Sequence, residues 1–237
     1  MRRTLLTLTA ALAATALFST ASQAQNFPDK TITFIVPFAA GSATDLLARA
    51  LAQAVTLDTK VSVVVDNKPG GNAFIGAQAA AKAKPDGYTV LIATNTTHAA
   101  NEHLFKKLPY DPVKDFEPLT LLGRGGQIML VNPSLGVNTV AEFVKLAKSK
   151  PGKLSFGSGS SSSRIAGELF KQMAGAYIVA IPYRSNPPAV TDLIGGQIDV
   201  MITDMATGLP QVKGGKLKAL GVSTLQRSPL APDVPTI

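Results

Sequence analysis

The chain has 237 residues, a formal net charge of +8 and no cysteine. The lack of cysteine excludes a disulfide framework and thiol chemistry. Basic residues are scattered and aromatic residues make up 6% of the chain, which argues against a nucleic-acid partner. The mildly positive net charge is compatible with an anionic small ligand, and it is equally explained by the need for solubility.

The chain begins with the three parts of a secretory signal peptide. Met1-Arg2-Arg3 is positively charged, an apolar run extends from Leu5 to Phe18, and small residues surround Ser22-Gln23-Ala24. The apolar run is too short for a good transmembrane helix. We therefore expect residues 1–24 to be removed after about Ala24 and the remaining chain to lie in the periplasm.

Strands and helices alternate in the first part of the chain that follows. Apolar runs predict strands at 31–36, 61–65 and 88–93, and helix-forming runs predict helices at 43–55 and 73–83. This order is typical of a doubly wound, mostly parallel sheet. A short helix at 95–105 and two short strands at 119–123 and 127–131 are expected next. Arg124-Gly125-Gly126 is interpreted as the passage out of a first α/β domain, residues 25–124.

A second α/β domain is expected over residues 125–222. Its first helix covers 139–148, where Thr139 and Glu142 have the spacing of a capping box. Further strands are predicted at 154–156, 177–181, 198–202 and 217–222, and further helices at about 165–173, 188–194 and 205–212. Residues 223–237 are expected to begin a segment that returns to the first domain.

Small or polar residues follow five of the predicted strands, which end at Val36, Ala93, Phe156, Ile181 and Ile202. Ligands of open α/β sheets bind at this edge. The loop from Phe38 to Asp45 leads into a helix whose first N–H groups would be free to hold a carboxylate or phosphate. An ordinary turn with Ser42 or Thr44 as the N-cap explains the same residues.

The other strand ends also allow two interpretations. Ser158 to Ser163 is either a binding loop or a flexible serine-rich linker. Arg184 would pair with an anion or lie in solvent, and Asp204 would hold an ammonium group or cap the next helix. His98 would either face a ligand or be an exposed or core-edge histidine that binds nothing.

Catalytic and metal-binding motifs are missing from the sequence. There is no G-x-S-x-G nucleophile motif, and His98 and His103 are five residues apart, which does not match the zinc-binding spacing H-E-x-x-H. We therefore expect no catalysis, no metal and no cofactor.

The chain resembles the periplasmic solute-binding proteins of tripartite tricarboxylate transporters, the Bug or TctC receptors. The resemblance extends from the signal peptide to the last residue. It rests on many short segments in order, among them Val36-Pro37-Phe38-Ala39-Ala40-Gly41, Pro85-Asp86-Gly87-Tyr88, Leu108-Pro109-Tyr110-Asp111-Pro112, Asp192-Leu193-Ile194-Gly195-Gly196-Gln197-Ile198-Asp199 and Pro232-Asp233-Val234-Pro235-Thr236-Ile237.

The resemblance implies a periplasmic-binding-protein-like clamshell of two α/β domains that closes on a small carboxylate. It also implies a membrane transporter as partner, and we expect a monomer. By position, the ligand would contact Phe38, Ala40, Gly41, Ser42, Thr44, Asp45, Thr94, Asn95, His98, Ser158, Gly159, Ser160, Ser161, Ser162, Ser163, Tyr183, Arg184, Ser185, Thr203 and Asp204.

This chain departs from the family pattern at several of these positions. It has Gly41-Ser42 where relatives have two glycines, Arg184-Ser185 in place of Lys-Gly, and Thr203-Asp204 in place of Asp-Asn. Relatives also continue past Ile237 with a tail that completes the first domain. A chain without that tail would expose apolar surface and a sheet edge, so we expect lower stability than in a full-length relative.

The sequence thus predicts a periplasmic receptor that captures a small carboxylate for a tripartite tricarboxylate-type transporter. Two alternatives are a secreted serine hydrolase, with a nucleophile from Ser158 to Ser163 and His98 as base, and a truncated remnant that binds nothing.

Overall fold

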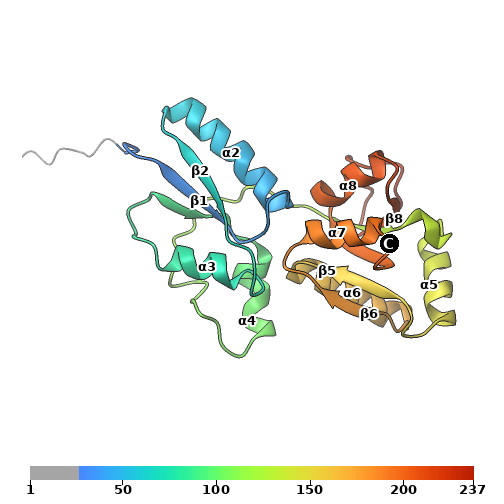
Figure 1. Cartoon of the computed structure of the whole chain (residues 1–237). Helices are drawn as coiled ribbons and strands as arrows, with labels where there is room; N and C mark the ends of the chain where they lie inside the picture. The colour runs from blue at the N-terminus through green and yellow to red at the C-terminus, as the bar shows by residue number, and fades with distance from the viewer. Residues whose placement is uncertain (1–26) are drawn as a thin grey trace, which may run out of the picture.

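The computed structural model describes residues 27–237, so the expected signal peptide lies outside the described residues. They form two lobes, each built on its own sheet (Figure 1). We call residues 27–116 the first lobe and residues 127–237 the second lobe. No helix within residues 27–237 has both the length and the hydropathy to cross a bilayer.

The first lobe is a three-stranded parallel sheet in the order β2-β1-β3. Its strands are β1 (Ile32–Val36), β2 (Val63–Asn67) and β3 (Thr89–Leu91), and its longer helices are α2 (Ala43–Thr59) and α3 (Phe74–Ala81). The helices cover opposite faces of the sheet (Figure 1). Phe34, Val36, Ala48 and Ile92 are among the buried residues of its core. After β3 come a π-helical turn, η1 (Thr96–Ala100), and α4 (Asn101–Leu104), and the lobe then continues to residue 116 without further helices or strands.

The second lobe is a five-stranded mixed sheet in the order β6-β5-β7-β4-β8. The strands are β4 (Gln127–Val131), β5 (Ser155–Ser158), β6 (Val179–Pro182), β7 (Val200–Asp204) and β8 (Lys218–Val222). β5, β6 and β7 are parallel to one another, whereas β4 is antiparallel to both β7 and β8. The antiparallel pairing places Gln127, the first residue of β4, directly opposite Asp204, the last residue of β7.

Helices cover both faces of this sheet because its central strands are apolar on both sides. Met129 and Val131 pack on one face with Phe143 of α5 (Val140–Ser149) and with α6 (Ser161–Ala174). Ile128 and Leu130 pack on the other face with α7 (Asn186–Ile194) and α8 (Met205–Lys213). A 3-10 turn, η2 (Pro133–Leu135), follows β4.

The segment that joins the lobes corrects one expectation. The strand predicted at 119–123 does not form, and residues 117–126 have no regular secondary structure. Leu119 is 77% exposed and Leu121 is 67% exposed. Their apolar pattern suggested a strand, but none of the strands in the described part of the chain pairs with this segment.

The last residues lie against the second lobe. Val222 N donates to Pro235 O at 2.8 Å and Ile237 N donates to Val222 O at 2.9 Å, so Thr236 pairs with Val222 in parallel orientation. The C-terminus is accordingly beside β8 in Figure 1. The domain boundaries proposed from the sequence, and the return of residues 223–237 toward the first domain, stay predictions.

Candidate functional site

A cavity of about 150 Å³ lies between the lobes. Both lobes supply its walls, mainly through residues at or just after the carboxyl ends of strands, where open α/β sheets bind ligands. The lining residues are Phe38, Ser42, Ala43, Thr44, Thr94, Asn95, Thr96, Gln127, Ser160, Ser162, Ser185, Asn186 and Asp204. In another protein, an apolar cavity of about this volume binds benzene, so there is room here for a small organic molecule.

Four α-helices begin at this cavity. Their N-cap residues all line it: Ser42 for α2, Ser160 for α6, Ser185 for α7 and Asp204 for α8. The first N–H groups of a helix have no partner within the helix, and the helix dipole gives that end a partial positive charge. The convergence of α2 and α6 from opposite lobes therefore favours a small anion between them.

Buried polar atoms at the cavity also indicate a binding site. Among residues 27–237, four buried side-chain oxygens have no hydrogen-bond partner: Thr94 Oγ1, Gln127 Oε1, Ser185 Oγ and Thr207 Oγ1. Three of them belong to residues that line the cavity, and Thr207 is the exception. A buried polar group without a partner is costly, so three at one place indicate a site whose partners come from a bound molecule.

The first loop is held in place by the carboxylate of Asp45, which is 2% exposed. It accepts hydrogen bonds from Gly41 N at 2.9 Å, Asn67 Nδ2 at 2.9 Å and Arg49 Nε at 3.0 Å. Burial raises the pKa of Asp45, but these donors outweigh burial and hold the pKa below its ordinary value of 3.8. Asp45 is thus occupied inside the protein and does not line the cavity.

Ser42 caps α2, as one of the two sequence interpretations proposed. Its Oγ accepts from Asp45 N at 3.2 Å, and the residue is 5% exposed. Its hydroxyl therefore points back to its own helix, which leaves the N–H groups of Ala43 and Thr44 beside the cavity as the first donors of α2.

The serine loop is fixed by close contacts with the start of α7. Gly159 N donates to Asn186 Oδ1 at 3.1 Å, and a β-carbon at position 159 would overlap the backbone of Ser185 and Asn186. Ser160 Oγ accepts from Ser163 N at 3.2 Å as the cap of α6. The loop is therefore an ordered helix start, which argues against the flexible linker.

Hydrogen bonds also join the two lobes at the rim of the cavity. Asn95 Nδ2 donates to Ser162 Oγ at 2.8 Å, and Ser161 N donates to Thr96 Oγ1 at 3.2 Å. Asn72 Nδ2 donates to Ser161 Oγ at 3.1 Å. The lobes thus meet where α6 begins.

Asp204 has the capping role that the sequence allowed. Its Oδ1 accepts from Thr207 N at 2.7 Å, and its Oδ2 accepts from Asn186 Nδ2 at 2.8 Å and Thr203 Oγ1 at 3.4 Å. Asp204 nevertheless lines the cavity, so capping and ligand contact are compatible at this residue.

His98 is turned toward an aromatic cluster. Its Nδ1 lies 2.8 Å from Thr97 Oγ1, and its ring packs on Phe116 with 4.7 Å between the ring centroids. Burial lowers the pKa of His98 below 6.5. In the described part of the chain no hydrogen bond links His98 to the serine loop, so a serine–histidine pair is not assembled.

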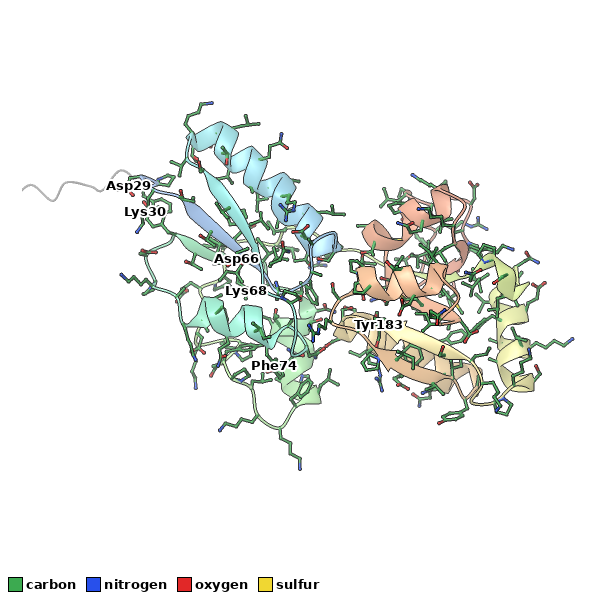
Figure 2. All side chains as sticks on the ribbon, in the orientation of Figure 1. Asp29, Lys30, Asp66, Lys68, Phe74 and Tyr183 are labelled. Atoms are coloured by element: carbon green, nitrogen blue, oxygen red, sulfur yellow. The ribbon has the colours of Figure 1, made fainter. Side chains whose placement is uncertain are left out.

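Tyr183 and Arg184 do not line the cavity either. Tyr183 lies in the second lobe beside α7 (Figure 2) and donates from Oη to Asp192 Oδ2 at 2.7 Å. Burial and the Asp192 carboxylate raise the pKa of Tyr183 to about 12. Arg184 is exposed.

The expected ligand residues therefore fall into two groups. The cavity brings together Phe38, Ser42, Thr44, Thr94, Asn95, Ser160, Ser162, Ser185 and Asp204. It does not include Ala40, Gly41, Asp45, His98, Ser158, Gly159, Ser161, Ser163, Tyr183, Arg184 and Thr203. Several of these make hydrogen bonds with lining residues, as Thr203 does with Asp204. Ala43, Thr96, Gln127 and Asn186 line the cavity and were not expected.

Comparison with known proteins identifies the family. The family model described as "Tripartite tricarboxylate transporter family receptor" (TctC) matches residues 47–237. The chain belongs to this family. Its members are periplasmic binding proteins, and its α/β fold is periplasmic-binding-protein-like.

Individual members of the TctC family are similar over most of this chain. A UPF0065 protein of Bordetella bronchiseptica is 38% identical over 222 residues, which are 94% of this chain and 66% of the relative. The structure of Rpa4515 of R. palustris with adipate is 34% identical with a TM-score of 0.88, over 90% of this chain and 72% of that one. MatC of Rhodopseudomonas palustris with bound malate is 31% identical with a TM-score of 0.83, over 89% and 72%. The chain thus spans about two thirds of the length of these relatives.

Proposed function

We propose that this TctC-family chain is a periplasmic receptor that captures a small organic carboxylate between its lobes. The observation that carries the proposal is the convergence on one cavity of four helix N-termini and three buried side-chain oxygens without partners. The starts of α2, α6 and α7 and the hydroxyls of Thr94 and Ser185 are neutral donors that can hold a carboxylate without any metal or cationic side chain, whereas Gln127 Oε1 can only accept. The relatives solved with adipate and malate support a carboxylate as the ligand class.

Delivery to a tripartite tricarboxylate-type membrane transporter is the second part of the proposal. Ligand binding would stabilise the closed arrangement of the lobes, and a membrane partner would recognise that arrangement. We further propose that the chain acts without catalysis and as a monomer. Detectable ester hydrolysis by the purified chain would overturn the first of these two statements.

Thermal unfolding with a panel of mono-, di- and tricarboxylates tests the proposal. A ligand present at a hundred times its dissociation constant adds about 2.7 kcal/mol of stability. For a chain of this size, that raises the melting temperature by about 5 to 10 °C. A cooperative melt that no acid in the panel shifts would contradict carboxylate capture.

Two threonines provide a matched pair of variants for this test. Thr94 Oγ1 and Thr207 Oγ1 are both buried without a partner, but only Thr94 lines the cavity. Thr94→Val should reduce the ligand-induced shift, whereas Thr207→Val should leave it unchanged. Neither variant should lower the stability of the ligand-free protein much, because each removes a polar group that makes no hydrogen bond within the chain.

A further inference from the structure

The charge of the cavity lining comes from Asp204. Among the described residues that line the cavity, Asp204 has the one ionisable side chain. Its three hydrogen-bond donors, Thr207 N, Asn186 Nδ2 and Thr203 Oγ1, are all neutral. Its negative charge is therefore hydrogen-bonded, but no cation in the lining offsets it.

Gln127 adds a second acceptor beside this carboxylate. The antiparallel pairing of β4 with β7 sets Gln127 directly opposite Asp204. Side chains at such paired positions project from the same face of the sheet, with β-carbons about 5 Å apart. Gln127 Oε1 is buried without a partner in the described residues, and Gln127 lines the cavity together with Asp204.

Hydrogen-bond donors also line the cavity. The lining contains the start of α2, where Ala43 and Thr44 supply N–H groups that have no partner within the helix. At α8, by contrast, the Asp204 carboxylate itself occupies the helix N-terminus and offsets its dipole. Donors from both lobes thus line the cavity, and its one charged acceptor among the described lining residues is Asp204.

We propose that Asp204 makes this receptor selective for carboxylates that carry an ammonium group, and that it disfavours dicarboxylates. This inference rests on the proposed function, since it assumes that one carboxylate of the ligand binds at the uncapped N–H groups of the helix starts. The ammonium group of the ligand would then face Asp204 and Gln127 Oε1. A second carboxylate at the same place would meet a like charge, which is unfavourable in a partly enclosed cavity.

Three four-carbon acids with one carboxylate in common provide the test. They are γ-aminobutyrate, γ-hydroxybutyrate and succinate, which end in an ammonium group, a hydroxyl group and a second carboxylate. Isothermal titration calorimetry on the chain should give the tightest binding for γ-aminobutyrate and the weakest for succinate, with at least a tenfold difference in Kd. The six-carbon pair ε-aminocaproate and adipate repeats the comparison at a second length.

Two variants at Asp204 separate charge selection from helix capping. Asp204→Asn and Asp204→Ser both remove the charge and keep a residue that caps helices well. Each should reduce the preference for the ammonium acid over the dicarboxylate at least tenfold. Asp199→Asn is the matched control, because the Asp199 carboxylate accepts from Ser155 N at 2.8 Å and does not line the cavity. It should keep the preference of the unmodified chain.

The outcomes distinguish this inference from the proposed function. Equal or tighter binding of the dicarboxylates overturns the inference and leaves carboxylate capture intact. An unchanged preference in both Asp204 variants shows that the residue only caps α8, which also overturns it. No binding of any of the five acids overturns the proposed function and this inference with it.

Discussion

Asn95 and Ser162 exchange hydrogen bonds between the two lobes. Asn95 Nδ2 donates to Ser162 Oγ at 2.8 Å, and Ser162 Oγ lies 3.0 Å from Asn95 Oδ1. Both residues line the cavity, so this contact lies where closure would enclose a ligand. The two residues come from different lobes and are 67 positions apart in the chain.

We predict that Ser162→Ala shifts the lobes toward a more open arrangement. Loss of this contact should cost about 1 to 2 kcal/mol, which changes the ratio of closed to open forms about tenfold. Small-angle X-ray scattering of the ligand-free protein should show a larger radius of gyration. Ser134→Ala is the control, because Ser134 bonds to Asn132 within the second lobe. An identical scattering curve for Ser162→Ala and the unmodified chain would contradict the prediction.

We predict that Asp45→Asn destabilises the protein and changes how its stability depends on pH. The pKa of Asp45 is lower in the folded chain than its ordinary value of 3.8. Its contribution to stability is therefore present above that ordinary value and is lost as the pH falls through the folded pKa. Denaturation in urea should show a loss of about 2 kcal/mol at neutral pH. The loss of stability between about pH 5 and pH 2 should then be shallower than in the unmodified chain.

A control on the same helix isolates this effect. Asp58 lies near the far end of α2 and is exposed, so Asp58→Asn removes a carboxylate from the same helix and should not lower the stability at neutral pH. If Asp45→Asn kept the original slope, the network with Gly41, Asn67 and Arg49 would not be the source of the pKa shift.

We predict that Gly159→Ala is strongly destabilising. A methyl group there would overlap the backbone of Ser185 and Asn186, which cannot move aside without displacing the start of α7. The loss in unfolding free energy should be about 3 kcal/mol or more, and binding should be lost with it. Gly125→Ala is the matched control, because a β-carbon at Gly125 meets nothing within 4 Å. Equal denaturation midpoints for the two variants would rule out the close approach of the serine loop to α7.

The sequence predicted the order of elements well because their apolar patterns are local. Strand runs such as 198–202 and cap residues such as Thr139 were visible directly, and Thr139 Oγ1 does accept from Glu142 N at 3.1 Å. The rule that ligands bind at strand ends also led to Thr94, Ser185 and Asp204, since that rule needs only the end of each strand.

The remaining parts of the site depend on long-range pairing, which has no local pattern. Gln127 enters the cavity because β4 pairs antiparallel with β7, whereas the sequence suggested only that the sheet is mostly parallel. His98 follows a strand as expected, but Phe116 offers its ring an aromatic partner away from the lining. Leu119 and Leu121 have the apolar pattern of a strand, but no strand of the described residues lies beside them.

The uncharged donors of the cavity have a consequence for the conditions in which the receptor works. Salt weakens attraction between exposed charges. Here the donors offered to an anion are backbone N–H groups and hydroxyls in a partly enclosed cavity, not lysine or arginine side chains on a surface. The affinity for the ligand's carboxylate would therefore change little with ionic strength. The fraction of receptor occupied would then follow the concentration of the ligand rather than the concentration of salt.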